Sequence, residues 1–206
     1  MKTYRMYASS INERYVDEVV ETLRRGGVVV YPTDSTYAIG CDALNNKAVE
    51  RVCRMRGINP AKQRLSMVCA DISQASEFAR IDNRAFRILR ENLPGPFTFI
   101  LPASTRLAKA FKGRHEVGVR VPNDDIARRL ATELGTPLLS ATAIWPDADA
   151  DALAHVDEVK MQMEAHGPDI FIDAGDVSGD ETAVISLLDP NEPEVIREGP
   201  VQPQGI

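Results

Sequence analysis

Apolar residues along the chain follow two patterns, helical spacing and short β-branched runs, which together predict an α/β domain. Helical spacing predicts helices over residues 11–25, 48–53, 83–91, 105–111, 126–134 and 156–166. Short apolar runs predict strands at 28–31, 65–69, 97–101, 117–121, 137–140, 169–172, 183–187 and 194–197. Because helices and strands do not alternate regularly, we expect a single twisted sheet of parallel and antiparallel strands flanked by helices, not a doubly wound Rossmann fold.

The whole chain, residues 1–206, is expected to form one domain, since its length and 44% hydrophobic content support one core. Residues 199–206 lack periodic apolar positions and are expected to form a flexible tail. No run approaches the roughly 20 apolar residues that span a bilayer, and the N-terminus lacks the apolar segment of a signal peptide. We therefore expect a cytoplasmic protein without membrane contact, and a monomer because no coiled-coil seam is evident.

The net charge of −6 is unevenly distributed along the chain. Residues 1–140 hold 22 Lys and Arg against 15 Asp and Glu, whereas residues 141–206 hold 2 against 15, which gives +7 and −13. Such asymmetry is compatible with a basic face for an anionic ligand and an acidic remainder that limits indiscriminate binding of polyanions. It is also compatible with two differently solvated surfaces of one domain.

Common signatures of metal sites and covalent catalysis are absent from the sequence. It contains no GxxxxGK[ST] loop, no GxGxxG between strand and helix, no HExxH and no GxSxG, and its three cysteines stand singly. Asp147, Asp149, Asp151 and Glu158 have the spacing of a calcium loop, but Ala152 stands where the sharp turn needs glycine. We therefore expect no metal site and no tightly bound cofactor, and the pattern identifies no catalytic nucleophile or base.

Hydroxyl groups and arginines gather near the ends of the predicted strands. Residues 33–36, Thr-Asp-Ser-Thr, follow the strand at 28–31, and Arg120 lies within the strand at 117–121, where an inward-facing guanidinium needs an anionic partner. Side chains of the same kinds adjoin three later strands: Ser140, Thr142, Thr182 and Arg197. Because ligands bind where strand ends converge, one shared polar cavity is predicted. A turn capped by its own hydroxyls would also explain residues 33–36 taken alone.

A basic segment runs from the end of one predicted helix through a loop broken by Gly57 and Pro60. It contains five cations and no acidic residue: Arg51, Arg54, Arg56, Lys62 and Arg64. Such cations can clamp a polyphosphate or contact the backbone of a nucleic acid, and Arg51, Arg54 and Arg64 are the candidates for RNA contact. A solvated helix face is the alternative interpretation.

Taken together, these residues make the chain resemble the YrdC/YciO-type family, which includes threonylcarbamoyl-adenylate synthases, from about residue 26 to residue 199. Residues 31–40, YPTDSTYAIG, are similar to the family's PTETxYGLG, and residues 94–98, PGPFT, are similar to its PGPxT. Further matching segments are VRVP at 119–122, the hydroxyl-bearing strand end at 140–142, TAVI at 182–185 and REG at 197–199. The resemblance therefore rests on several motifs in the same order.

The resemblance implies an open YrdC/RibB-like sheet around a large, positively charged cavity, with affinity for double-stranded RNA or tRNA. Active members convert L-threonine, bicarbonate and ATP, with Mg²⁺ beside the nucleotide, into threonylcarbamoyl-AMP and pyrophosphate for tRNA threonylcarbamoyladenosine modification. Carried over by position, amino-acid binding falls to Ser35, Arg120 and Thr182. Contact with the nucleotide phosphates falls to Arg56, Lys62, Ser140, Thr142 and Arg197.

The chain departs from the synthase pattern at three places. The Lys-x-Arg of the synthases reads Arg56-Gly57-Ile58, so an apolar residue replaces the second cation, and a planar guanidinium replaces the first ammonium. The Ser-x-Ser-x-Asn element ends in Ile144, and Cys69 aligns where the synthases tend to carry histidine. These changes point to the YciO branch, for which binding of nucleotide or RNA without synthesis of the adenylate is the alternative function.

Overall fold

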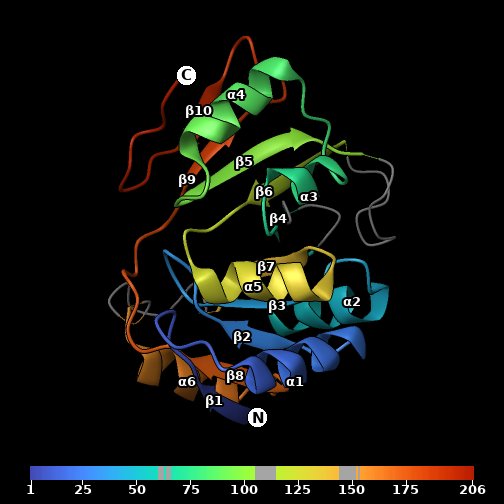
Figure 1. Cartoon of the computed structure of the whole chain (residues 1–206), viewed down its shortest axis with the longest axis vertical. Coiled ribbons are helices and arrows are strands. Elements are labelled where there is room, and N and C mark those ends of the chain that lie inside the picture. The colour runs from blue at the N-terminus through green and yellow to red at the C-terminus, as the bar shows by residue number, and fades with distance from the viewer. Residues whose placement is uncertain (60–62, 64–65, 105–114, 144–151, 153) are drawn as a thin grey trace.

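A computed structural model describes residues 1–59, 63, 66–104, 115–143, 152 and 154–206. Strands along these ranges form one ten-stranded sheet that runs the length of the molecule (Figure 1). The strands are β1 (Lys2–Arg5), β2 (Val29–Tyr31), β3 (Ala38–Asp42), β4 (Ser66–Val68), β5 (Phe97–Pro102), β6 (Glu116–Arg120), β7 (Leu138–Thr142), β8 (Ile170–Asp173), β9 (Ala183–Ser186) and β10 (Glu194–Arg197).

The sheet order is β1-β8-β2-β3-β7-β4-β6-β5-β9-β10, and its pairings are mixed. Four pairings are parallel, namely β1 with β8, β2 with β8, β4 with β6 and β5 with β9. The other five are antiparallel. The predicted open, mixed sheet flanked by helices is therefore confirmed.

Six helices are described, and five of them begin at a side-chain cap of the kind that satisfies the first free N–H groups. They are α1 (Glu13–Arg24), α2 (Asn46–Met55), α3 (Ile72–Ser76), α4 (Asn83–Asn92), α5 (Asp125–Leu134) and α6 (Val156–Glu164). Asp124 caps α5 by accepting a hydrogen bond from the Ala127 amide at 2.8 Å. The helix ends at Gly135, whose φ of 77° suits glycine.

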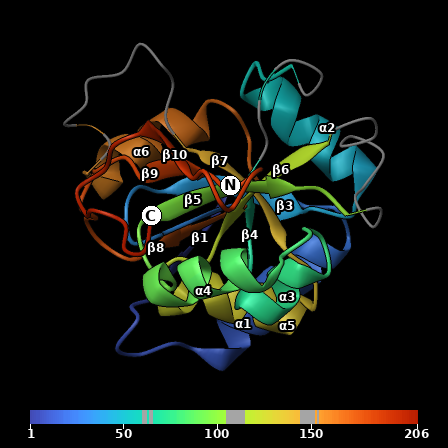
Figure 2. The ribbon, with the colours of Figure 1, turned by 90° about the horizontal axis from the view of Figure 1, so that it is seen from above.

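Alternation along each strand divides the core between the two faces of the sheet. Val29, Tyr31 and Leu138 share one cluster with α1 and α5, whereas Val30 and Phe171 share the other with α2 and α6. The second cluster also contains the buried residues of α3 and α4. Figure 2 shows helices on both sides of the twisted ribbon. The described helices on the first face, α1 and α5, cover only part of it and leave the rest of that face open.

The predicted elements that lie in the described ranges are present to within two residues at either end. Three short elements escaped prediction: β1, β3 and α3. In β1 only Tyr4 is buried, so the strand has no apolar run, and α3 has five residues, too few for a helical period. The helix predicted at 105–111 lies outside the described residues. None of the described helices is long and apolar enough to cross a membrane.

Residues 199–206, expected to be flexible, make specific contacts with the end of α4. The Asn92 side chain accepts a hydrogen bond from the Gln204 amide at 2.8 Å and donates to the Gln204 carbonyl at 3.0 Å. It also donates to the Ile88 carbonyl at 2.7 Å within its own helix. The segment has no periodic apolar signal because one buried amide, not a hydrophobic face, attaches it.

We predict that Asn92→Ala releases this segment and lowers the free energy of unfolding by about 1–3 kcal/mol, since three hydrogen bonds of a buried amide are lost. Urea denaturation measures the loss, and limited proteolysis measures release of residues 199–206. Exposed Asn191→Ala, away from the contact, is the matched control. Unchanged stability and unchanged proteolysis in the Asn92 variant would contradict the attachment.

Candidate functional site

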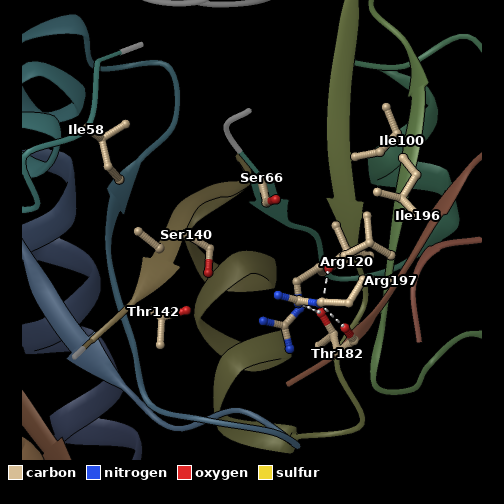
Figure 3. Close-up of a pocket in the computed structure, with 12 residues that line it drawn as sticks. Ile58, Ser66, Ile100, Arg120, Ser140, Thr142, Thr182, Ile196 and Arg197 are labelled. Carbon is tan, nitrogen blue, oxygen red and sulfur yellow. Dashed lines mark hydrogen bonds between the residues drawn. The ribbon is translucent and has the colours of Figure 1, made fainter. Parts of the chain in front are cut away.

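A cavity of about 540 Å³ lies on the sheet face that α1 and α5 cover only in part (Figure 3). Its walls come from β4, β5, β6, β7, β9 and β10, with Ile58 from the loop after α2 and Thr182 from the position just before β9. The described residues that line it are Ile58, Ser66, Thr98, Ile100, Arg120, Ser140, Ala141, Thr142, Thr182, Val184, Ile196 and Arg197. The cavity therefore gathers residues from six strands.

Small residues make the floor of the cavity flat. Ser66 of β4 stands opposite Ser140 of β7 on one side and Gly118 of β6 on the other. A Cβ atom on Gly118 would lie 2.5 Å from the Ser66 hydroxyl oxygen and 3.2 Å from the Ser66 Cα atom. Glycine is therefore needed at this point for space, and the side chains leave room above the strands for a ligand.

A β-bulge turns two consecutive residues of β10 toward the cavity. Val195 pairs with Ile185 and Arg197 pairs with Val184, so Ile196 is the extra residue. A bulge breaks the simple alternation of a strand and redirects its side chains. As a result both Ile196 and Arg197 line the cavity.

Arg120 is the buried cation of the site. One of its terminal nitrogens, Nη2, donates hydrogen bonds to Ser35 Oγ at 3.0 Å, Asp34 Oδ1 at 3.3 Å and Thr33 Oγ1 at 3.4 Å. The other oxygen of Asp34 accepts from the Asn123 amide at 2.7 Å. The arginine of β6 thus ties the loop between β2 and β3 to the cavity wall, and its charge has the anionic partner that burial requires.

Burial lowers the pKa of the Arg120 guanidinium, because the charged form loses its hydration, whereas the Asp34 carboxylate opposes this effect. The positive charge of Arg197 lowers the pKa of Arg120 further. Figure 3 shows the two side chains next to each other, and an anion placed beside both guanidiniums would offset this unfavourable effect on Arg120.

Arg197 lies at the same end of the cavity as Arg120 and is held there by Thr182. It donates from Nε to the Thr182 carbonyl at 3.0 Å and from Nη2 to the Thr182 hydroxyl at 3.3 Å. Its Nη1 forms an ion pair with Glu181 at 3.0 Å. The Thr182 and Thr98 hydroxyl oxygens lie 3.0 Å apart. Figure 3 shows Arg120, Thr182 and Arg197 together at one end of the cavity and Ile58 on the opposite side.

The structure brings together many of the residues that the sequence singled out. Five of them line the cavity: Arg120, Ser140, Thr142, Thr182 and Arg197. Ser35 is buried, is not among the described lining residues, and accepts a hydrogen bond from Arg120 at 3.0 Å. Arg56 lies at the C-cap of α2, half-buried, and is not among the described lining residues. Lys62 and Arg64 lie outside the described residues, as do Asp147, Asp149, Asp151 and Ile144.

The two remaining candidates for RNA contact differ in their surroundings. Arg51 forms an ion pair with Asp169 at 2.6 Å and donates to the Gly167 carbonyl at 2.8 Å, so it joins α2 to the segment before β8. Arg54 is exposed on the next turn of the helix. Arg51 therefore has an internal structural partner, whereas Arg54 faces solvent.

Sequence reasoning missed Ser66, Thr98, Ile100, Val184 and Ile196 as residues of the cavity. Each lies in a strand whose inward face the sequence cannot assign, because register decides which of two alternating sets faces the ligand. Cys69, aligned with a histidine of the synthases, is a fully buried core residue, and burial raises the pKa of its thiol. That thiol is packed in apolar surroundings, as a structural cysteine is.

The sequence of this chain is similar to those of several known proteins. Residues 21–199 match the Sua5/YciO/YrdC family model, which is described as "Telomere recombination". The uncharacterized protein YciO of Escherichia coli is 37% identical over 189 residues, which cover 91% of this chain and 90% of that protein. A threonylcarbamoyl-AMP synthase of Chromobacterium violaceum is 39% identical over 123 residues, 59% of this chain and 63% of that protein.

Two solved structures share the fold. The crystal structure of E. coli YciO superposes with a TM-score of 0.88 at 34% identity and covers 98% of both chains. P. abyssi Sua5 in complex with L-threonine superposes with a TM-score of 0.81 at 25% identity, covering 96% of this chain and 57% of that one. This chain thus spans little more than half of Sua5, but nearly all of YciO. The family model covers most of its length, and the chain belongs to the Sua5/YciO/YrdC family.

Proposed function

We propose that this protein binds L-threonine and an adenine nucleotide in the cavity and carries out adenylate-forming chemistry of the threonylcarbamoyl-AMP type, in the service of tRNA modification. The observation that carries the proposal is the convergence of Arg120, Thr182 and Arg197 at one end of a cavity with Ser140 and Thr142 along its wall. Relatives named threonylcarbamoyl-AMP synthase and the threonine complex of Sua5 support the choice of ligands.

The proposed reaction has two steps that balance. The threonine amine attacks bicarbonate and water leaves, which gives the N-carboxylate. A carboxylate oxygen then attacks the α-phosphate of ATP, and pyrophosphate leaves with the electron pair of the broken P–O bond. Since neither step needs a covalent bond to the protein, positioning and charge stabilisation supply the catalysis.

The residues of the cavity suit these tasks. The Arg120 guanidinium, fixed by the Ser35 hydroxyl, is suited to hold the threonine carboxylate, and the Thr182 hydroxyl lies near enough to Arg197 to share that ligand's polar end. Ser140 and Thr142 offer hydroxyl donors to a phosphate. Mg²⁺ is proposed to enter with ATP and to neutralise part of the phosphate charge.

We predict that the purified protein releases pyrophosphate from ATP only when L-threonine and bicarbonate are both present. A coupled pyrophosphate assay measures the rate, with each substrate omitted in turn as the control. Mass spectrometry of the quenched reaction is expected to detect threonylcarbamoyl-AMP. Release that is independent of either substrate would rule out this reaction.

We predict that Arg120→Lys weakens L-threonine binding by about 10- to 100-fold, since an ammonium cannot replace a charge-assisted, forked contact worth about 1.5–3 kcal/mol. Isothermal titration measures the affinity, and thermal melting verifies that the variant is folded. Arg129→Lys on α5, whose partners are Glu13 and Glu133, is the matched control and is expected to bind normally. Equal affinities for the two variants would remove Arg120 from the threonine site.

A second function, binding of structured RNA without synthesis of the adenylate, is favoured by one observation at the cavity. Ile58 lines the wall at the position where the synthases carry the second cation of Lys-x-Arg. Exposed Arg54 is then a candidate for contact with the RNA backbone.

For this second function we predict that binding to tRNA weakens as salt rises, because displaced counterions drive the association. Arg54→Ala is expected to lower the slope of log affinity against log salt by about 0.7–0.9, the value of one phosphate contact. Arg14→Ala on α1, where the side chain is 84% exposed, is the matched control. Binding that does not change with salt would exclude an electrostatic RNA interface.

A further inference from the structure

The two cations that line the described part of the cavity already have acidic partners. Arg120 pairs with Asp34 at 3.3 Å, and both side chains are about 90% buried. Arg197 pairs with Glu181 at 3.0 Å. The positive charge left for a ligand is therefore smaller than two arginines suggest.

This remaining charge is concentrated at one point. Figure 3 shows Arg120 and Arg197 next to each other, and Arg197 also contacts the Thr182 hydroxyl at 3.3 Å. The Nε atom of Arg120 is buried and has no hydrogen-bond partner among the described residues. One anionic group beside the two guanidiniums would offset their like charges. It would also accept a hydrogen bond from the Nε–H group of Arg120.

Apart from the two arginines, the described wall carries hydroxyl groups and four aliphatic side chains, but no other charged group. Ile58, Ile100, Val184 and Ile196 line the cavity together with the polar residues, and Figure 3 shows Ile58 across the cavity from Arg120 and Arg197. Beside these aliphatic side chains, the further phosphates of a bound polyphosphate would lose their hydration without gaining a charged partner. Bringing a charge into apolar surroundings without a partner is costly.

The position of Ile58 is fixed by the way α2 ends. The Ile58 amide donates to the Cys53 carbonyl at 2.8 Å, and the Gly57 amide donates to the Arg54 carbonyl at 3.2 Å. Gly57 has a φ of 61°, the left-handed conformation that this helix ending needs. This pair of bonds is a Schellman motif, and it holds Ile58 at the cavity wall while Arg56 remains at the C-cap.

We propose that the cavity selects nucleotides by charge, that it accepts a single phosphate group, as in a nucleoside monophosphate or an acyl adenylate, in preference to a triphosphate, and that Ile58 sets this preference. The inference rests on the proposed function, because it concerns the same nucleotide site. It adds that the adenylate is held more tightly than ATP. Capture of ATP, not retention of the adenylate, is then the weak step of the proposed reaction.

The test compares the affinities of AMP, ADP and ATP for the full chain by isothermal titration at one ionic strength, with EDTA and without threonine. We expect affinity to fall in the order AMP, ADP, ATP, with AMP about fivefold or more tighter than ATP. Ile58→Arg is expected to tighten ATP by about tenfold, since a charge-assisted contact to phosphate is gained, and to change AMP by less than about threefold.

Two controls separate charge from shape. Ile58→Gln changes the polarity of the wall without adding charge, and Met161→Arg adds the same charge on α6, where the side chain is exposed and outside the cavity. Neither is expected to reverse the order of the nucleotides. If Ile58→Arg fails to fold in thermal melting, the series of three nucleotides on the unmodified chain still decides the preference.

Each outcome has a distinct meaning. ATP bound more tightly than AMP by the unmodified chain overturns this inference and leaves the proposed function intact. An equal effect of Ile58→Arg and Met161→Arg overturns the role of Ile58. Absence of binding for all three nucleotides overturns both the inference and the nucleotide part of the proposed function.

Discussion

The buried guanidinium of Arg120 is the interaction on which the site depends. It lies in the middle of the sheet, yet its hydrogen-bond partners are in the loop between β2 and β3, more than eighty residues earlier in the sequence. A buried charge of this kind is tolerated only when its partners are in place. The Asp34 carboxylate and the hydroxyls of Thr33 and Ser35 therefore hold Arg120 in place, and Arg120 in turn holds their loop against the sheet.

The cavity beside Arg120 lies on the part of the sheet face that the described helices leave uncovered. Helices α1 and α5 bury one part of the face, and the remaining part carries Ser66, Gly118 and Ser140 in register across three strands. Larger side chains at Ser66 and Ser140 would reduce the space, and a Cβ atom on Gly118 would lie 2.5 Å from the Ser66 hydroxyl oxygen. The cavity thus exists because small residues coincide with the part of the face that the described helices leave uncovered.

Family membership and the details of the cavity address different questions. The overall likeness to YciO and to Sua5 establishes the fold and the family. The proposed ligand preference concerns fewer positions, above all Ile58 at the wall after α2. A fold can host several related chemistries, so the function has to be argued from the residues of the site.

The sequence by itself determined the elements with a clear period and the family. Helix α5, with Asp124 before it and Gly135 after it, could be predicted because local capping and spacing determine a helix. The pairing of Arg120 with an anionic partner was also predictable, since burial of a lone arginine in a strand requires one. The order of the motifs identified the family, and the resemblance to the family pointed to five of the residues that line the cavity.

Only the tertiary structure decided which side chains share the cavity. Ser66 became a floor residue through its register with Ser140 and Gly118, and pairing between distant strands is not encoded in local pattern. Ile196 lines the cavity because of a bulge that no periodicity signals, whereas Arg56 lies at the C-cap of α2 and is not among the described lining residues. Local propensity determines helices and strands, whereas the position of a side chain relative to a ligand depends on long-range packing. The set of residues that line the cavity could therefore be identified only from the tertiary structure.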